Sequence, residues 1–179
     1  MRATGIVRRI DDLGRIVIPK EIRRTMRMRE GDPLEIFTSG DGEIMLKKYS
    51  MIGQLADFSR NYAENLYKVS GLRCVICDTD HVVASGGPGR KEAMGSAITR
   101  DMEEIISGRM SYFKQFPGEK SIFTHRGAAS PAVGVTPIIN SGDCAGVVAL
   151  LADDGRSLTE TQKKLLVLTS TLLAGNLGS

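Results

Sequence analysis

Apolar residues in the first third of the chain come in short runs separated by turn residues. The predicted strands cover residues 3–10, 15–18, 34–37 and 44–46. Pro19 cannot donate to a strand ladder and suits a first helical turn, so a helix over residues 20–28 is expected directly after the second strand. Asp41-Gly42 is a strong hairpin signal between the last two strands. The first 49 residues therefore predict two hairpin-like units around one short helix.

Residues 50–69 show the spacing of a helix instead. Their inward positions step by three and four residues, as in a heptad seam. The seam consists of Ile52, Leu55, Ser59, Tyr62, Leu66 and Val69. A helix of this kind packs inside its own domain or against its copy in a second chain. We favour a connector helix that also supports a dimer.

The rest of the chain alternates between strand and helix patterns. Further strands are predicted over residues 72–77, 81–84, 122–124, 132–139 and 145–151. Helical stretches are expected over residues 91–106 and behind the capping-box pattern of residues 157–160. The apolar residues expected on or beside the inner face of this last helix are Leu165, Leu168, Leu172, Leu166 and Leu173. The order predicts an α+β sandwich in which helices cover an antiparallel sheet.

Bulk composition fits a globular protein of one or two domains. The 179 residues are 41% hydrophobic and 25% charged. The longest apolar run, residues 144–151, is too short to span a bilayer, and no apolar signal region opens the sequence. Three cysteines argue against a disulfide framework. We expect a cytoplasmic protein without a membrane partner, located on the nucleoid if DNA is bound.

The net charge is confined to one end of the chain. Residues 1–49 hold 11 Lys and Arg against 8 Asp and Glu, a net charge of +3, whereas residues 50–179 hold 13 of each kind. A small basic module joined to a larger neutral one is typical of a nucleic-acid reader with an attached second domain.

Several ordered motifs in the basic module resemble the AbrB family of bacterial transition-state regulators. They are Thr4-Gly-Ile-Val-Arg-Arg9, Asp12-Leu-Gly-Arg-Ile-Val-Ile-Pro19, Glu21-Ile-Arg-Arg-Thr25, Gly31-Asp-Pro-Leu-Glu-Ile-Phe37 and Ile44-Met-Leu-Lys-Lys-Tyr49. The resemblance implies a swapped-hairpin, looped-hinge-helix β-barrel dimer over residues 1–50 that binds double-stranded DNA.

The same resemblance implies that Arg8, Arg15, Arg23 and Arg24 contact DNA. Arginine suits this role because it is always charged and offers a planar donor fork to phosphates and guanine edges. Weaker DNA-binding candidates are Arg9, Lys20, Lys47 and Lys48. The alternative is that all of these are ordinary solvated charges. Without a long recognition helix, we expect recognition to rely partly on DNA shape.

So small a module cannot bury much apolar surface, and no disulfide or metal supplements its core. We therefore expect a homodimer through residues 1–50. The second domain, residues 56–179, is reached through a connector helix over residues 51–70. Its element order, with Pro137-Ile-Ile-Asn-Ser-Gly-Asp143 before Gly146-Val-Val148, resembles GAF domains, which are small sensor modules.

The GAF resemblance implies a sensing or assembly domain whose paired terminal helices form a second contact between chains; if the two modules associate with different partners, a tetramer is possible. No motif for cyclic nucleotide, haem or bilin is present, so no cofactor is predicted and a small-molecule effector stays unidentified. Aromatic residues in the segment 108–119, namely Tyr112, Phe113 and Phe116, are candidates for a lid over a ligand pocket. Equally, they could patch the edge of the core.

No catalytic or metal site is predicted. Cys74 and Cys77 have metal-like spacing, but residues three apart on a strand point to opposite faces, and no second pair exists. The chain is interpreted as a transcriptional regulator and not as an enzyme, and the family resemblance implies that it activates some late sporulation genes and represses others. One alternative is an antitoxin-like DNA-binding protein with a protein partner. Another is a GAF-type thiol reductase using Cys74, Cys77 and Cys144.

Overall fold

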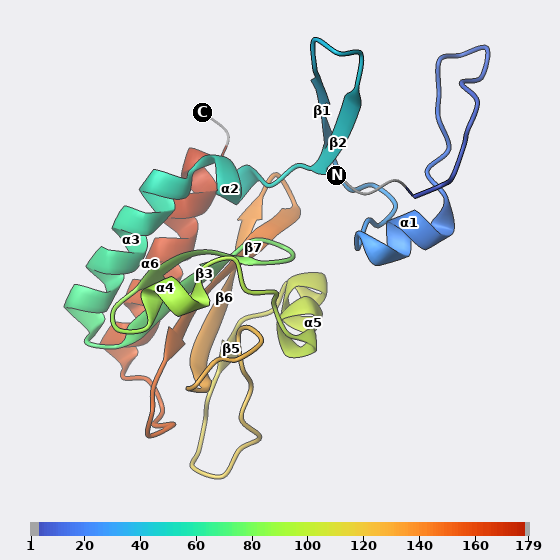
Figure 1. Cartoon of the computed structure of the whole chain (residues 1–179). Coiled ribbons are helices and arrows are strands. Elements are labelled where there is room, and N and C mark those ends of the chain that lie inside the picture. The colour runs from blue at the N-terminus through green and yellow to red at the C-terminus, as the bar shows by residue number, and fades with distance from the viewer. Residues whose placement is uncertain (1–3, 178–179) are drawn as a thin grey trace. The chain divides into compact units, whose positions relative to one another are not determined.

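The computed structural model describes residues 4–177 and divides into two compact units, Met1–Tyr49 and Ser50–Ser179 (Figure 1). Within the described residues, the first unit contains a short helix and a two-stranded hairpin, and the second contains a five-stranded sheet with helices. None of the helices within residues 4–177 is both long and apolar enough to cross a membrane.

The first unit contains helix α1 (Lys20–Thr25) and an antiparallel hairpin of β1 (Leu34–Thr38) and β2 (Ile44–Lys48). The hairpin predicted around Asp41-Gly42 is confirmed, with Gly42 at a φ of 79° in its turn.

Helix α1 is shorter than predicted because the chain reverses after it. Arg27 adopts a left-handed φ of 53°, and the Met28 N–H donates to the carbonyl of Arg23 at 2.8 Å. The Arg27 N–H donates to the carbonyl of Arg24 at 3.3 Å. This pair of bonds is the Schellman ending of a helix.

The strand predictions for residues 4–10 and 15–18 are wrong for a single chain, while residue 3 lies outside the described residues. Neither segment belongs to a β-ladder within the described residues. Their apolar side chains lie in solvent: Val7 is 84% exposed and Val17 is 73% exposed. A strand without neighbours cannot satisfy its backbone or bury its side chains.

The second unit is built on one antiparallel sheet with the strand order β4-β3-β7-β6-β5. Its strands are β3 (Arg73–Cys77), β4 (Val82–Gly86), β5 (Tyr112–Phe113), β6 (Ala132–Asn140) and β7 (Asp143–Leu151). The predicted β6–β7 hairpin is confirmed. Ser141 and Gly142 turn it with φ of 50° and 88°, the two positive values that a type I′ turn requires. The predicted strand at 122–124 is reduced to one bridge, Ile122 to Ala132.

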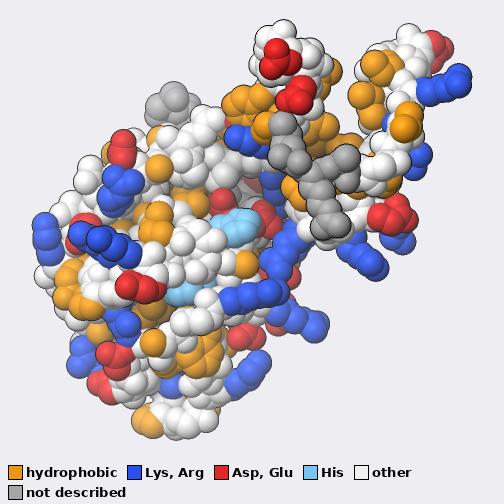
Figure 2. Space-filling view, viewed as in Figure 1, with side chains coloured by type: hydrophobic (Ala, Val, Ile, Leu, Met, Phe, Trp, Pro, Cys, Tyr) orange, Lys and Arg blue, Asp and Glu red, His pale blue; other side chains and the backbone are white. Residues whose placement is uncertain are grey.

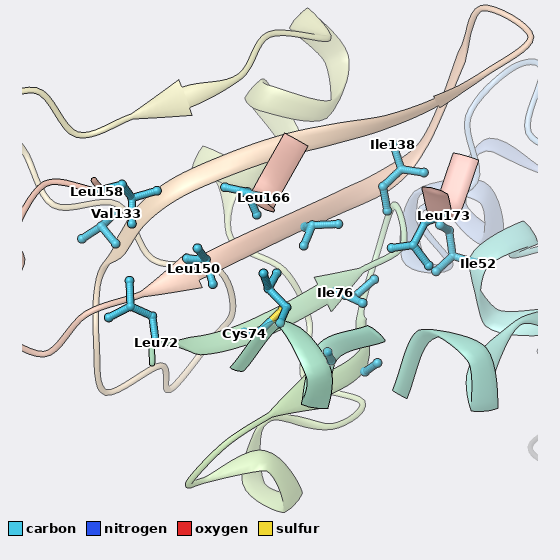
Figure 3. Close-up of a cluster of buried hydrophobic side chains, with 14 of the residues drawn as sticks. Ile52, Leu72, Cys74, Ile76, Val133, Ile138, Leu150, Leu158, Leu166 and Leu173 are labelled. Carbon is cyan, nitrogen blue, oxygen red and sulfur yellow. The ribbon is translucent and has the colours of Figure 1, made fainter. Parts of the chain in front are cut away.

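Helices cover both faces of this sheet. On one face lie α2 (Met51–Gln54), α3 (Ala56–Ser70) and α6 (Glu160–Asn176), and on the other α4 (Arg90–Ala93) and α5 (Arg100–Gly108). Figure 3 shows the first of the two resulting cores, where Ile52, Leu166 and Leu173 meet Ile76 and Leu150. The second core contains residues such as Val75, Met102 and Val147. The predicted α+β sandwich is confirmed.

The connector helix differs from its prediction. It breaks at Leu55, between α2 and α3, and its buried side chains include Ile52, Ala63 and Leu66, whereas Val69 at the end of the expected seam is 68% exposed. The helix packs on its own sheet, and its buried residues Ser59, Ala63, Leu66 and Ser70 keep the steps of three and four residues.

The last helix also differs. Its capping box joins Thr159 and Gln162, not Ser157 and Glu160. Its buried face consists of Leu166, Thr169, Ser170 and Leu173. Two of the leucines expected inside are outside, with Leu168 53% exposed and Leu172 40% exposed.

Candidate nucleic-acid interface

The loop that carries Arg15 is organised by Asp11. The Asp11 carboxylate accepts the backbone N–H groups of Leu13 at 3.0 Å and of Arg15 at 2.7 Å. It also pairs with the Arg15 guanidinium at 2.8 Å. The backbone N–H of Arg15 and then its guanidinium lower the pKa of Asp11. Arg15 is thus presented on a tight turn closed by its own salt bridge, with 68% of its side chain exposed.

Helix α1 carries the second pair of predicted DNA contacts. Arg23 and Arg24 are both exposed in its last turn. Neighbouring helical residues project about 100° apart, so both guanidinium groups can leave the same open side. Neither takes part in an ion pair within residues 4–177, so their charge is available to a partner.

The remaining basic candidates fall into two groups. Arg8, Arg9 and Lys20 are exposed, and the Arg8 guanidinium donates only to the neighbouring carbonyl of Val7 at 3.2 Å. Lys47 lies over the ring of Phe37, with its ammonium 4.8 Å from the ring centre. Lys48 pairs with Asp32 at 3.2 Å and is 19% exposed, so it joins the end of β2 to the segment just before β1.

The first unit therefore presents positive and apolar groups together. Figure 2 shows Lys and Arg side chains projecting from it beside exposed apolar ones. Arg15 lies on a loop, and Arg23 and Arg24 lie on a helix. Their hydrogen bonds and ion pairs within residues 4–177 do not join these segments to each other.

The three aromatic residues proposed as a lid lie at the edge of the sheet. Tyr112 and Phe113 form β5, paired with Val135 and Gly134 of β6. Tyr112 packs against one core cluster and Phe113 against the other, while Phe116 is 59% exposed. This placement favours the core-edge alternative over the lid.

The cysteines are placed as structural residues. Cys74 and Cys77 are buried in different core clusters, on opposite faces of β3. Burial raises the pKa of both thiols, and it also raises that of Cys144. A reactive thiol needs a lowered pKa. Within residues 4–177, no group of three or more His, Cys, Asp or Glu side chains could hold a metal ion.

One polar cluster in the second unit has no counterpart in the sequence-based predictions. The Arg73 guanidinium donates to the Ser130 hydroxyl and to the Asp153 carboxylate, and Ser130 also donates to Asp153. Two cavities, of about 230 Å³ and 400 Å³, share Arg73, Pro88 and Leu151 in their walls. Arg73, Ser130 and Asp153 are far apart in sequence, and only the order of the strands in the sheet brings them together.

Comparisons with known proteins agree with both units. A family model described as stage V sporulation protein T C-terminal, transcription factor, matches residues 54–178. A second, described as antidote-toxin recognition MazE, bacterial antitoxin, matches residues 7–54. Stage V sporulation protein T of Bacillus subtilis (strain 168) is 42% identical over 174 residues, which cover 97% of this chain and 97% of that protein.

The first unit and the second unit each have further relatives. The transition state regulatory protein AbrB of Bacillus subtilis (strain 168) is 57% identical over 49 residues, covering 27% of this chain and 50% of that protein. The solved GAF domain of a phosphoenolpyruvate-protein phosphotransferase from Coxiella burnetii has a TM-score of 0.55 at 16% identity, covering 69% of this chain and 82% of that one. Both resemblances drawn from the sequence are confirmed, the second at the level of the fold.

Proposed function

The chain belongs to the family of stage V sporulation protein T, and from that premise we propose that it is a DNA-binding regulator of transcription. It would act on late sporulation genes in the cytoplasm, at the nucleoid, activating some and repressing others. Residues 1–50 would bind double-stranded DNA as a homodimer. Residues 51–70 would form the connector helix between this domain and the second, and residues 56–179 would sense a ligand or support assembly. No catalytic step is part of this proposal.

The observation that carries the proposal is the set of unpaired arginines in the first unit. Arg23 and Arg24 have no ion pair within residues 4–177, whereas most exposed arginines of the second unit lie beside a carboxylate. Arg60 pairs with Asp57 at 2.9 Å and Arg100 with Glu104 at 3.1 Å. Unpaired guanidinium groups at close spacing repel each other, and a phosphate backbone neutralises them with release of counterions.

Dimerisation of the first unit is supported by its exposed apolar segments. The segments 4–10 and 15–18 lack ladder partners within the chain, and a second copy of the same hairpins would provide them. The dimer would double the four arginines to eight and place loop and helix on one surface. A second contact through the exposed leucines of α6 would give a tetramer.

The test compares one arginine in each unit. In the full chain, Arg23→Ala should weaken binding to operator DNA about tenfold and flatten the plot of log affinity against log salt by about two units, because each phosphate contact contributes about 0.9 and the dimer loses two. Arg100→Ala is the matched control, since Arg100 is equally exposed but lies in the second unit and pairs with Glu104. Equal salt slopes for wild type and Arg23→Ala would refute the assignment.

A second candidate function is favoured by the antitoxin match over residues 7–54. An antitoxin-like protein would bind a toxin protein as well as DNA. Here the rest of the chain is a folded unit with a net charge of zero, not an acidic tail. Stable co-purification of a toxin from the native host, lost without residues 50–179, would favour this candidate over an independent regulator.

A further inference from the structure

The smaller cavity beside Arg73 has the make-up of a small-molecule site. Its apolar wall includes Val75, Ala93 and Leu151, all of them buried, and its volume is about 230 Å³. Ligand sites are mostly apolar with a few polar groups that fix orientation, and typical volumes begin at about 300 Å³. A cavity of this size suits a ligand with a short side chain and little else.

Three buried polar side chains line the same cavity. Ser130 is 2% exposed, and Ser85 and His125 are each 7% exposed. The Ser85 hydroxyl donates to the carbonyl of Cys74 at 3.2 Å. His125 Nδ1 lies 2.8 Å from the hydroxyl of Thr124, while within residues 4–177 its Nε2 has no hydrogen-bond partner. The Nε2 of His125 is therefore available to a ligand or to water, because this residue lines the cavity.

Arg73 provides the positive charge of the cavity, and its present partner is easily replaced. The guanidinium binds Asp153, but the Asp153 side chain is 79% exposed, against 23% for Arg73. An ion pair with so exposed a carboxylate contributes little net stability. The planar guanidinium fork matches a carboxylate in a bidentate fashion, so a ligand carboxylate can take the place of Asp153.

Glu92 provides the negative charge of the same cavity. It lies in α4 and has no ion pair within residues 4–177. One guanidinium and one carboxylate give the wall a net charge of zero, which complements a ligand that carries both charges itself. A bare anion such as phosphate would leave Glu92 and the apolar wall unused.

We infer that this cavity binds a small α-amino acid with a compact aliphatic side chain. The carboxylate of the ligand binds Arg73 and Ser130, its ammonium group faces Glu92, and its side chain contacts Val75, Ala93 and Leu151. This inference rests on the sensing role in the proposed function. It also suggests how binding is transmitted to the rest of the unit. When the ligand displaces Asp153 from Arg73, the segment from Asp153 to Thr159, the N-cap of α6, loses this contact.

The test uses the full chain with L-valine and two analogues, each lacking one charge. L-valine should raise the thermal midpoint of the second unit in proportion to the logarithm of its concentration, as expected for a ligand that binds only the folded state. Isobutylamine lacks the carboxylate and 3-methylbutanoate lacks the ammonium group. Each should bind at least tenfold more weakly by titration calorimetry.

Two substitutions locate the site. Glu92 is exposed, so Glu92→Gln should leave the fold intact. It should weaken the binding of L-valine about tenfold and leave the binding of 3-methylbutanoate unchanged. Arg73→Lys should weaken both carboxylates. Glu104→Gln, an exposed carboxylate on α5, should change neither. Equal binding of valine and 3-methylbutanoate, equal affinity in the Glu92 and Glu104 variants, or no binding of valine at about 10 mM would overturn the inference.

The same preparation separates this inference from the proposed function. Operator binding is measured without any added amino acid. A protein that binds DNA but not valine refutes the cavity assignment alone, and one that binds valine but not DNA refutes the regulator.

Discussion

The two units of this chain differ in how many of their apolar side chains they bury. Within residues 4–49, Pro19 is the single buried residue, and every other buried apolar side chain of the described chain is Ile52 or a later residue. The second unit closes a core on each face of its sheet. The first unit leaves apolar side chains such as Val7, Ile10 and Val17 in solvent.

Charge is distributed in the reverse sense. The unit without a core carries the whole net charge of the protein, and the unit with two cores is neutral. The comparison supports the proposal that the first unit binds two kinds of partner: another copy at its exposed apolar segments and an anion at its arginines. The second unit needs neither to fold, which leaves its surface and its cavity free for regulation.

The largest expected effect comes from a substitution that disrupts the proposed dimer of the first unit. In an extended segment, neighbouring side chains point to opposite faces, so Ile16 would lie opposite Arg15 and face the interior of the proposed dimer. Ile16→Asp would bury two unpaired carboxylates per dimer and should destabilise it by more than about 5 kcal/mol. Sedimentation equilibrium of the full chain should show its mass halved, and operator binding should be lost.

Val17→Asp is the matched control, because Val17 shares a face with Arg15. It should keep the mass of the wild type and weaken DNA binding only through its charge. If Ile16→Asp retained both mass and affinity, the interior of the proposed dimer would lie elsewhere and the contrast between the units would fail.

The second prediction concerns the core of the second unit. Leu166 is fully buried, and Leu166→Ala should lower the free energy of unfolding by about 2–5 kcal/mol at every protein concentration. Leu168→Ala lies two positions further on the same helix, where the side chain is 53% exposed, and should cost below about 1 kcal/mol in the monomer. Urea unfolding at two protein concentrations measures both.

A cost for Leu168→Ala that grew with protein concentration would show that α6 also meets a second copy. The second unit would then share the dependence on a partner that the first unit has, and the comparison would be sharpened. Equal costs for the two leucines at all concentrations would contradict the packing of α6.

Turn residues in the sequence were sufficient to predict two of the hairpins. The β1–β2 and β6–β7 hairpins follow from Asp41-Gly42 and Ser141-Gly142, because positive φ is available there. The inner face of α6 did not follow, since leucines occur around the helix. Thr169 and Ser170 are buried in place of leucines because their hydroxyls donate to carbonyls of the same helix, at 2.8 Å and 2.9 Å.

What the sequence could not supply is contact between distant segments. Arg73 meets Ser130 and Asp153 across separations of 57 and 80 residues, and nothing local marks any of the three. The strands predicted for residues 4–10 and 15–18 fail for a related reason, since pairing depends on distant segments and no strand within the described residues pairs with them. The basic residues of the first unit were readable because charge is a property of composition, which requires no knowledge of contacts.

The third prediction compares one position in each unit. Arg27 and Arg109 both adopt a left-handed conformation after a helix, with φ of 53° and 52°. Glycine removes a steric cost of about 1–2 kcal/mol there but adds about 0.5–1 kcal/mol of unfolded-state entropy. Arg27→Gly and Arg109→Gly should therefore each gain about 0.5–1 kcal/mol, measured by urea unfolding.

The gain from Arg27→Gly should appear in a transition that depends on protein concentration, and that from Arg109→Gly in one that does not. A loss of stability in either variant would show that the arginine side chain contributes more than its backbone costs.

The smallest expected effect is a pH dependence from a histidine, a residue type that the first unit lacks. Residues 1–49 contain no histidine, whereas burial lowers the pKa of His125. Below the unfolded value of about 6.5, the unfolded chain takes up a proton that the folded chain resists, so stability falls as the pH falls. The loss begins near pH 6.5 and grows until the folded state is protonated as well.

His125→Gln should therefore flatten the decline in unfolding free energy of the second unit between pH 7 and pH 5, measured by urea unfolding. His81→Gln is the control, because His81 is exposed on the same unit. The amide keeps a donor and an acceptor near Thr124, so a flatter profile would report the lost titration and not a lost contact. An unchanged slope in His125→Gln would mean that the imidazole is protonated without cost, and that the wall of the cavity is wetter than its burial indicates.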